Sequence, residues 1–401
     1  MKELPAVLGG APVFSETVSI SRATLPEFDA VVDSYRDIFS TGMVTNGKYL
    51  KEFEERMARY LGVAHAVGVS SASTGLLLTF KALGLKGEVI VPSFTFSMTG
   101  HALAWNGLRP VFVDIDPETC VIDPEKVEKA ITPDTCAILG VHIWGNPCQA
   151  DRLQEIADRH NIPLLFDAAQ GTGSRYLERP VGGFGNAEVL SLSPTKLVVS
   201  GEGGIVATND AELARRVRIG RAYGDDGSYD CLYEGMNARM SELHAVLGLA
   251  SLEMADKNIA HRLKLFDLYR SRLRKLPGIQ FQKITPGGVP NGVYFSIIID
   301  SERFGLTRDQ LYEALKAEHV DTRRYYHPPM HRQSVNAHLA PQYEGKLPNT
   351  DKIAANSLTL PMFSHMTEEQ VKGVCQAIER LHAHREEVRK RMGAAATGGH
   401  R

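Results

Sequence analysis

Cysteine is scarce in this chain, and its placement argues against two classes of protein. The sequence contains five cysteines, an odd number, and no two of them form a Cys-x-x-Cys pair. Disulfide frameworks and structural zinc sites both depend on paired or closely spaced cysteines. We therefore expect a protein of a reducing compartment, the cytoplasm, with no disulfide framework and no metal site.

Long apolar runs and an excess of one charge are also absent. No stretch of 18 or more consecutive apolar residues occurs, so no membrane-spanning helix is expected. The first five residues lack the apolar core of a signal peptide. Basic side chains number 45 and acidic side chains 47, which gives a net charge of −2. This balance predicts no attraction to nucleic acid or to an anionic membrane.

The remaining composition is that of an ordinary globular protein. Hydrophobic residues make up 43% and charged residues 23% of the 401 positions. A chain of this length is too long for one small core, so two packed domains are expected. We assign residues 1–250, including the N-terminal segment, to a large domain and residues 251–392 to a smaller one. Residues 393–401 (GAAATGGHR) are expected to form a flexible tail.

Short apolar runs alternate with amphipathic stretches between about residues 60 and 210. The predicted strands are 64–71, 88–94, 109–115, 136–145, 163–169, 187–193 and 204–208. Strands that are apolar throughout and alternate with helices are typical of a sheet that is covered on both faces. The large domain is therefore predicted to be α/β, with a mostly parallel seven-stranded sheet between helices.

The pattern changes after residue 239. Apolar residues recur at helical spacing over 239–275, which predicts one long helix. A predicted strand at 293–299 is followed by two helices that begin after Thr307 and Thr367. Both helix starts read Thr-x-x-Gln, the pattern of a capping box. These elements predict a smaller α+β domain at the C-terminal end.

A lysine in a glycine-rich region is the strongest local sign of chemistry. Lys196 ends the segment 191–196 (SLSPTK), which follows a predicted buried strand, and 201–204 (GEGG) comes soon after it. Glycines there allow the backbone to approach a ligand closely. A lysine in a surface loop would have the same sequence, so these residues alone leave both interpretations open.

A carboxylate ends another predicted buried strand. Asp167 follows the apolar residues of 164–166 (LLF), at the sheet edge where open α/β folds bind ligands. A partly desolvated carboxylate normally needs a cationic partner, and a protonated pyridine nitrogen would provide one. An aspartate that caps the next helix is the competing interpretation, and Asp167 alone favours it.

Hydroxyl groups precede a helix that is predicted over 74–84. The segment 70–75 (SSASTG) joins a strand to this helix, where hydroxyls and free amides can bind a phosphate. A serine-rich cap without a ligand would look the same. The chain lacks GxGxxG after a strand and GxxxxGK[ST], which disfavours dinucleotide and P-loop sites. His327 and His331 are separated by two prolines, so a substrate-facing loop is expected rather than a metal pair.

The order of these signals resembles that of a known family. A phosphate loop, an aromatic strand end, Asp167 and, 29 residues later, Lys196 follow one another along the chain. The sequence is similar to the DegT/DnrJ/EryC1/StrS family of sugar aminotransferases, which depend on pyridoxal 5′-phosphate (PLP) and have the fold-type I architecture of the aspartate aminotransferase superfamily. The similar segments are 40–49 (STGMVTNGKY), 91–99 (VPSFTFSMT), 141–147 (VHIWGNP), 167–170 (DAAQ), 191–204, 235–243 (GMNARMSEL), 325–331 (YYHPPMH) and 358–367 (LTLPMFSHMT).

The resemblance implies how the chain binds the PLP ring. Lys196 would carry PLP as a Schiff base and later move a proton at the substrate carbon. Asp167 would keep the pyridine nitrogen protonated, so that the ring accepts electrons. Gln170 would hydrogen-bond the 3-oxygen of the ring, and Phe96 would stack on the face of the ring.

The phosphate contacts and the oligomeric state are implied in the same way. Ser73, Thr74 and Ser191 would hold the phosphate, although 72–74 (AST) departs from the Gly-Thr-Ala usual in the family. Asn237 matches an asparagine that reaches the phosphate of the neighbouring subunit. This match implies a homodimer with shared active sites.

The resemblance also implies the reaction. The expected amine donor is glutamate or glutamine, and the expected acceptor is a nucleotide-linked 3- or 4-keto-6-deoxy sugar, with Tyr326, His327 and His331 as substrate contacts. A cyclitol aminotransferase is an alternative, because 8–13 (LGGAPV) is faintly similar to that branch. A regulatory protein that keeps the PLP fold without turnover is a second alternative.

Overall fold

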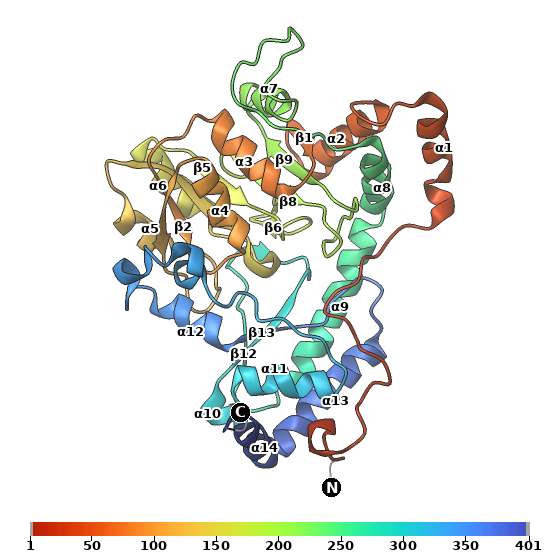
Figure 1. Ribbon diagram of the computed structural model, residues 1–401, viewed down its shortest axis with the longest axis vertical. Helices are drawn as coiled ribbons and strands as arrows, with labels where there is room; N and C mark the ends of the chain where they lie inside the picture. Colours follow the sequence, from red (N-terminus) through yellow and green to blue (C-terminus); the bar gives the residue numbers. More distant parts are fainter. Residues whose placement is uncertain (1–2, 398–401) are drawn as a thin grey trace.

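The seven predicted strands of the large domain form one sheet in the computed structural model, which describes residues 3–397 (Figure 1). The order of the strands is β1–β9–β8–β5–β4–β2–β3. Their bounds are β1 (His65–Val69), β2 (Glu88–Pro92), β3 (Arg109–Val113), β4 (Thr135–Val141), β5 (Leu164–Asp167), β8 (Ala187–Ser191) and β9 (Gly204–Thr208). Strand β9 pairs antiparallel with β1 and β8, and the other four strand pairs of this sheet are parallel, so the prediction of a mostly parallel seven-stranded sheet is confirmed.

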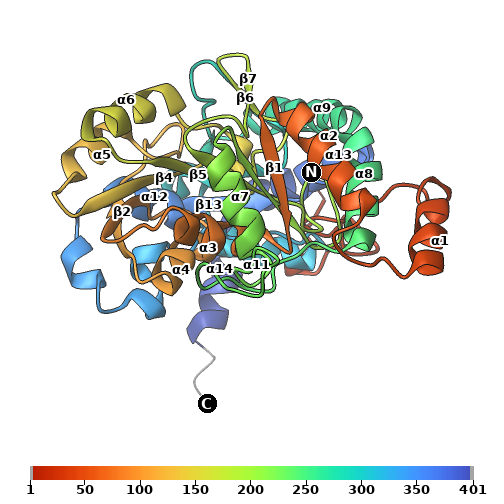
Figure 2. The same ribbon diagram turned by 90° about the horizontal axis from the view of Figure 1, so that it is seen from above.

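Helices cover both faces of this sheet (Figure 2). One face carries α2 (Lys48–Leu61), α5 (Pro124–Ala130), α6 (Ala150–His160) and α8 (Glu242–Glu253), and the other carries α3 (Ala72–Ala82), α4 (Ser97–Trp105) and α7 (Ala211–Gly220). Successive strand residues alternate between the two cores, as Val89 and Ile90 do in β2. Because both faces are buried, every strand position favours an apolar residue, which accounts for the continuous apolar runs.

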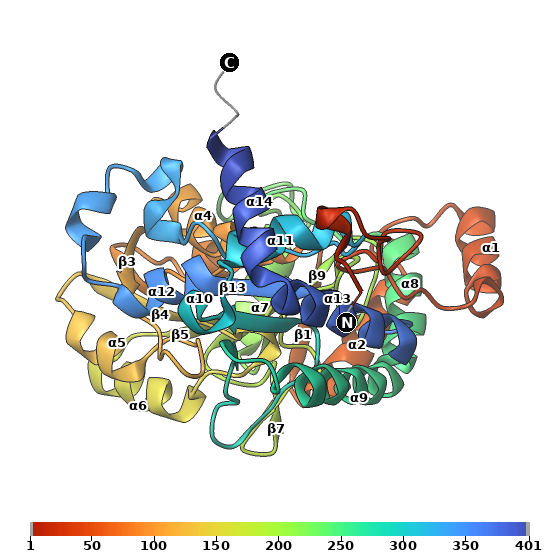
Figure 3. The same ribbon diagram turned by 90° about the horizontal axis from the view of Figure 1, so that it is seen from below.

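The smaller domain lies below the large one in Figure 1. Its antiparallel sheet has the order β10 (Ile279–Phe281), β12 (Phe295–Ile299) and β13 (Ser357–Leu360). The helices of this region are α9 (Ala255–Leu273), α10 (Ser301–Phe304), α11 (Arg308–Ala317), α12 (Pro348–Asn356), α13 (Glu368–Ala383) and α14 (Arg385–Thr397). Figure 3 shows α9, α11, α13 and α14 from below. The smaller α+β domain follows the large α/β domain, which is the arrangement expected from the resemblance to fold-type I enzymes.

Shorter elements complete the fold. A third sheet pairs β11 (Gly288–Val289) with β6 (Arg175–Tyr176), which also pairs with β7 (Arg179–Pro180). Helix α1 (Val32–Thr41) lies at the periphery in all three views. The short 3-10 helices are η1 (Ala6–Leu8), η2 (Phe28–Ala30), η3 (Ile143–Gly145), η4 (Met330–Arg332), η5 (Ser334–Asn336) and η6 (Ala340–Tyr343). None of the helices in residues 3–397 is long and apolar enough to span a bilayer.

The N-terminal segment packs differently from the division that we expected. Val18 belongs to the core of the smaller domain, and Phe14 packs against that core. The backbone N–H groups of Ala6 and Val13 donate to the two carboxylate oxygens of Glu318, at 2.9 and 3.0 Å. The segment that we grouped with residues 1–250 thus contacts the C-terminal domain, and the boundary at residue 250 stays a prediction.

The predicted single helix over 239–275 is wrong. Two helices, α8 and α9, replace it, and they meet at Met254. The Met254 N–H bonds to the carbonyl of Ser251 at 3.1 Å, three residues back, so the turn tightens there. The hydroxyl of Ser251 accepts the Val199 N–H at 2.9 Å and thereby supports the segment that follows Lys196. A contact with a distant loop therefore coincides with the break.

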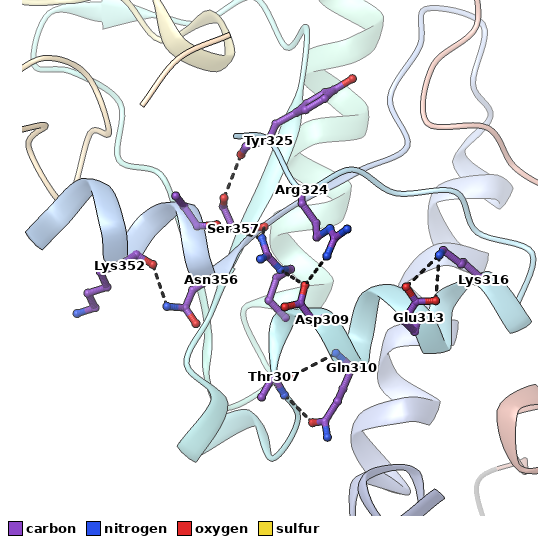
Figure 4. A network of polar contacts seen from close by, with 12 residues as sticks. Thr307, Asp309, Gln310, Glu313, Lys316, Arg324, Tyr325, Lys352, Asn356 and Ser357 are labelled. Atoms are coloured by element: carbon purple, nitrogen blue, oxygen red, sulfur yellow. Dashed lines mark hydrogen bonds and ion pairs between the residues drawn. The ribbon is translucent and has the colours of Figure 1, made fainter. Parts of the chain in front are cut away.

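The two predicted capping boxes are confirmed. At the start of α11, Thr307 Oγ1 accepts the Gln310 N–H at 3.1 Å and Gln310 Oε1 accepts the Thr307 N–H at 3.0 Å (Figure 4). The Thr367–Gln370 pair makes the same two bonds at the start of α13. Each box satisfies two backbone N–H groups that the helix itself leaves unpaired.

The first part of the segment that we expected to form a flexible tail is helical. Helix α14 continues to Thr397, whereas we expected the tail to begin at residue 393. Residues 398–401 lie outside the described residues, so the prediction for them is untested.

Candidate active site

A cavity of about 290 Å³ lies where the carboxyl ends of the strands meet. Loops that leave β1, β2, β5 and β8 form its wall, together with three tyrosines from segments beside the smaller domain. Seven of the residues predicted from the sequence line this one cavity: Ser73, Phe96, Asp167, Gln170, Ser191, Lys196 and Tyr326. An edge of this kind is where open α/β sheets bind their ligands.

Lys196 lies on the cavity wall and is half-buried. The loop that carries it is fixed by backbone bonds, because Lys196 N donates to Ser193 O at 3.0 Å and Ser200 N donates to Leu192 O at 2.9 Å. The ammonium Nζ lies 3.4 Å from the hydroxyl oxygen of Tyr294. The lysine thus points into the molecule, unlike a lysine in a simple surface loop.

Asp167 ends β5 and is only 6% exposed. Thr99 Oγ1 donates to its Oδ2 at 2.7 Å, and the Ala169 N–H donates to its Oδ1 at 3.1 Å. Burial raises the pKa of Asp167, and the hydrogen bond from Thr99 opposes that shift. The next residues form turns and not a helix, so Asp167 caps no helix. A buried carboxylate with these neutral donors can accept a cationic ligand group.

The N-terminus of α3 faces the same cavity. Ser71 and Ser73 line the wall, and Ser71 Oγ accepts the Thr74 N–H at 3.1 Å. The Thr74 hydroxyl, which we expected at the phosphate, instead donates to Ser71 O at 2.8 Å and completes the cap. Thr74 is absent from the residues that line this cavity in the described chain. The helix end itself still offers backbone N–H groups and a positive dipole to an anion.

The close packing around Gly204 explains why the segment 201–204 (GEGG) has a glycine at this position. A Cβ atom at this position would lie 2.6 Å from the backbone nitrogen of Ala72, at the start of α3. The first residue of β9 therefore approaches the helix N-terminus more closely than any side chain permits. Gly204 lets the sheet and the N-terminus of α3 meet close to the cavity that Lys196 lines.

An amide and two aromatic rings form another part of the wall. Gln170 Oε1 accepts the Trp144 N–H at 2.7 Å, and Gln170 Nε2 donates to Tyr326 Oη at 2.8 Å. The Phe96 ring is 55% exposed, and its centroid lies 6.3 Å from that of Tyr326. An apolar ring that stands open at a cavity can cover the face of a flat ligand.

Besides Thr74, three predicted residues do not line this cavity in the described chain: Asn237, His327 and His331. Asn237 and His327 are exposed. His331 is buried, with its Nδ1 2.7 Å from Ser93 Oγ and its Nε2 3.2 Å from Asp351 on α12. The proline-rich segment therefore brings Tyr326 to the cavity without the two histidines.

Thr99 and Tyr294 were not predicted from the sequence as site residues, whereas Ser71 lies in the segment 70–75 that we expected to bind a phosphate. Thr99 lies within a segment that resembles the family, and its hydroxyl could have been suspected there. Tyr294 immediately precedes a strand of the smaller domain, 98 positions after Lys196. No local pattern joins residues so distant in sequence, so only the tertiary structure reveals this contact.

The family of the chain follows from comparison with known proteins. The model of the DegT/DnrJ/EryC1/StrS aminotransferase family matches residues 29–379. The chain belongs to this family. It is therefore an aminotransferase.

Individual members of the DegT/DnrJ/EryC1/StrS family match over nearly the whole chain. A dTDP-4-amino-4,6-dideoxy-D-glucose transaminase of Escherichia coli is 33% identical over 371 residues, which cover 89% of this chain and 96% of the relative. A dTDP-3-amino-3,4,6-trideoxy-alpha-D-glucose transaminase of Streptomyces venezuelae is 37% identical, with 85% and 89% covered. The solved structure of DesI in the presence of its TDP-sugar product is 38% identical, covers 98% of both chains and superposes with a TM-score of 0.88.

Proposed function

We propose that this chain is a PLP-dependent sugar aminotransferase that binds its cofactor covalently through Lys196. It would move an amino group from glutamate or glutamine to a nucleotide-linked 3- or 4-keto-6-deoxy sugar. One observation carries the proposal: the Lys196 amine, the buried Asp167 carboxylate and the N-terminus of α3 converge on a single cavity.

The residues of the cavity fit PLP group by group. Ser73, Ser191 and the end of α3 suit a phosphate, and the desolvated Asp167 suits a protonated ring nitrogen. The amide of Gln170 can donate to the 3-oxygen, and Phe96 can cover the ring. When bound, PLP supplies an electron sink for the negative charge that develops at the substrate carbon.

Lys196, Asp167 and Thr99 would each have a separate role in the reaction. Once it is released from its covalent bond, the Lys196 amine would take a proton from the substrate carbon and would later return it. Asp167 keeps the ring nitrogen protonated, and Thr99 fixes the orientation of that carboxylate through its 2.7 Å hydrogen bond. Each of these groups is preorganised by packing, which avoids the cost of reorienting solvent during the reaction.

The names of the relatives and the cavity wall support a sugar as acceptor. The two enzymes compared above act on dTDP-linked amino sugars by their names. Tyr325 and Tyr326 place aromatic faces on the wall, against which the apolar face of a sugar ring can pack. A cyclitol has a similar ring, so a keto-inositol such as scyllo-inosose remains the second candidate acceptor.

The charges of the wall support a shared site in a homodimer. Among the described residues that line the cavity, Lys196 is the only lysine or arginine, whereas Asp167 and Glu202 are acidic. The phosphate of PLP and the carboxylates of glutamate need more cations or N–H groups than one chain provides in this cavity. Asn237 is exposed on its own chain and would reach the phosphate in the partner subunit. Exposed apolar side chains on and beside α1, such as Phe39 at 79%, could be covered by the second subunit.

Borohydride trapping tests the role of Lys196. Reduction of the holoenzyme should bleach its visible band and leave the pyridoxyl group on Lys196, as found by peptide mapping. Lys196→Ala should abolish this label and the turnover and keep the fold. Lys316→Ala, which removes a surface lysine paired with Glu313, serves as the control and should label normally. A pyridoxyl group on another lysine would overturn the assignment.

A second experiment identifies the acceptor. The enzyme is first loaded with an amino group by excess glutamate or glutamine, and the donor is removed. Nucleotide-linked keto sugars and scyllo-inosose are then added separately at equal concentration, and the return of the visible band is followed for each. A faster return with the nucleotide-linked sugar supports the proposal, whereas a faster return with scyllo-inosose supports the cyclitol alternative.

A further inference from the structure

Tyr294 is a hydrogen-bond partner of the Lys196 amine. Its hydroxyl oxygen lies 3.4 Å from Lys196 Nζ and 3.4 Å from Thr195 Oγ1. Lys196 Nζ also lies 5.5 Å from the centroid of the Tyr294 ring. Tyr294 is only 7% exposed and lines the cavity, so a charge on its hydroxyl would be poorly solvated. The tyrosine touches the atom that the proposed function makes reactive.

The charge of a buried arginine, Arg262, acts on Tyr294. Arg262 on α9 is 1% exposed, and its guanidinium donates to Ser364 Oγ at 2.8 Å and to the carbonyl of Val293 at 3.1 Å. Both acceptors are neutral, and no carboxylate in residues 3–397 forms an ion pair with Arg262. Burial lowers the pKa of Arg262 to about 10. A buried cation in such surroundings favours negative charge on a nearby group.

The charges around Tyr294 act together on its hydroxyl. Burial would raise its pKa, but the Lys196 charge, the hydrogen bonds from Thr195 and Lys196, and the Arg262 charge outweigh burial and lower it. Tyr325 and Tyr326 also face this group, and burial raises the pKa of each. Tyr294 is therefore the one tyrosine of the three that the structure prepares to lose its proton.

The backbone around Tyr294 is fixed from two sides. Asn291 Nδ2 donates to the carbonyls of Gln170 and Thr172, at 2.7 and 2.8 Å, and Asn291 Oδ1 accepts the Val293 N–H at 2.9 Å. These bonds tie the tyrosine to the turn that follows Asp167. Tyr325 is held separately, because its carbonyl accepts Ser357 Oγ at 3.0 Å (Figure 4). These hydrogen bonds thus hold the backbone at Tyr294 in a fixed position relative to Lys196 and Asp167.

We propose that Tyr294 is a catalytic residue that exchanges a proton with Lys196 during transamination. In one direction an N–H bond of the Lys196 ammonium breaks and an O–H bond forms on the Tyr294 phenolate, which leaves a neutral amine and a neutral phenol. The reverse step restores the ammonium and the phenolate, so protons and charge balance. The inference rests on the proposed function, because it takes Lys196 as the reacting amine. An ammonium group has no free lone pair, so an internal acceptor for its proton makes the Lys196 amine available as a base.

An ultraviolet titration of the cofactor-free, full-length protein tests the charge state directly. The difference between wild type and Tyr294→Phe isolates the ionisation of one of 13 tyrosines. Its midpoint should lie below the ordinary value of 10.0, and Lys196→Met should move it above that value, because burial then acts with less opposition. A midpoint at or above 10.0 in wild type, or one that Lys196→Met leaves in place, would overturn the proposal.

Kinetics of the holoenzyme give the second test. Tyr294→Phe should lower kcat by about 100-fold with little change in KM, as expected for loss of an acid–base group. Tyr312→Phe removes a hydroxyl from α11 of the smaller domain, outside the cavity, and should keep the wild-type pH profile. If Tyr294→Phe folds poorly, difluorotyrosine at position 294 preserves the shape and should shift the pH profile to lower pH. An unchanged pH profile in Tyr294→Phe, or in the protein with difluorotyrosine at position 294, would overturn the role of Tyr294.

Different results would overturn the role of Tyr294 and the role of Lys196. Borohydride should still label Lys196 in Tyr294→Phe, since the cofactor needs no tyrosine for its covalent bond. Labelling of Lys196 with wild-type kcat in Tyr294→Phe overturns only the role of Tyr294. Absence of label on Lys196 in wild type overturns the proposed function and, with it, this inference.

Discussion

At the scale of single residues, Asp167 combines two properties that oppose each other. Its carboxylate is buried beside neutral donors, so the fold bears the cost of desolvating a charge at neutral pH. A bound ring with a protonated nitrogen would offset that cost. The same side chain therefore destabilises the empty protein and stabilises the loaded one.

The charge of Asp167 should be essential for turnover. Asp167→Asn keeps the size of the side chain and removes the charge, so the ring nitrogen loses the partner that keeps it protonated. We expect kcat to fall at least ~100-fold, equivalent to about 2.7 kcal/mol of transition-state stabilisation. Asp158→Asn on the surface of α6 is the matched control. Near-normal turnover of Asp167→Asn would mean that this carboxylate has only a structural role.

The stability of the cofactor-free protein should depend on the same carboxyl. Folding raises the pKa of Asp167 above its ordinary value of 3.8, so its contribution to stability is present below that value and is lost as pH rises through the raised pKa. Cofactor-free Asp167→Asn should therefore have a higher Tm than wild type at pH 7. The difference should shrink as the pH approaches 4. Thermal unfolding across this range measures it, and equal Tm values at pH 7 would contradict the argument.

At the scale of elements, α3 shows one cap that serves two purposes. Ser71 closes the helix start through its bond with the Thr74 N–H and also lines the cavity. The cap of α13 at Thr367 has the same design but packs in the smaller domain. The pair allows the effect of capping on stability to be separated from any effect on ligand binding.

Replacing each cap by alanine tests this separation. Ser71→Ala and Thr367→Ala should each lower the free energy of unfolding by about 0.5–2 kcal/mol, the usual effect of losing such a cap. Only Ser71→Ala should also weaken PLP binding, because it disturbs the end of α3 that faces the cavity. Denaturant unfolding and PLP titration of both variants measure the two effects. Equal losses of PLP affinity would show that the affinity follows general stability.

Elements also differ in how well the sequence predicts them. The strands of the large sheet are visible as apolar runs because both of their faces are buried, and this requirement acts on every residue. The break between α8 and α9 is not visible, because the turn at Met254 accompanies a contact between Ser251 and Val199. Apolar periodicity continues through the break, so the pattern predicts one helix where there are two.

At the scale of the whole molecule, the proposed dimer has a decisive test in Asn237. Lys196→Ala and Asn237→Asp are each expected to be inactive, the second because it repels the phosphate. If Asn237 acts across the interface, a mixed dimer contains one site with both defects and one site with neither. With equal amounts and free exchange, activity should return to about a quarter of the wild-type value. If Asn237 acts within its own chain, mixing restores nothing.

The mixing experiment needs proof that subunits exchange. Native mass spectrometry of the mixture should show mixed dimers before a lack of activity is interpreted. PLP should also stabilise the dimer by mass action, since a ligand held by both chains binds the assembled form preferentially. Dilution of the protein with and without PLP, followed by light scattering, measures that coupling. Identical dissociation in both cases would argue against a shared phosphate site.

The sequence by itself determined the features that depend on local spacing. The apolar runs predict the strands, the two Thr-x-x-Gln starts predict their helices, and Asp167 and Lys196 follow buried strands at the sheet edge where ligands bind. In each case the physical cause, such as burial of both faces or an unpaired N–H, acts within a few residues. Such causes leave a readable pattern.

Only the tertiary structure decided which distant side chains meet. Tyr294 reaches Lys196, and Arg262 lies behind it, because α9 and the segment before β12 cross from the smaller domain to the cavity. His331 is buried against Ser93 instead of facing the cavity, and the N-terminal segment packs on the C-terminal core. These contacts depend on how whole domains pack, a property to which every element contributes and which no short stretch of sequence encodes.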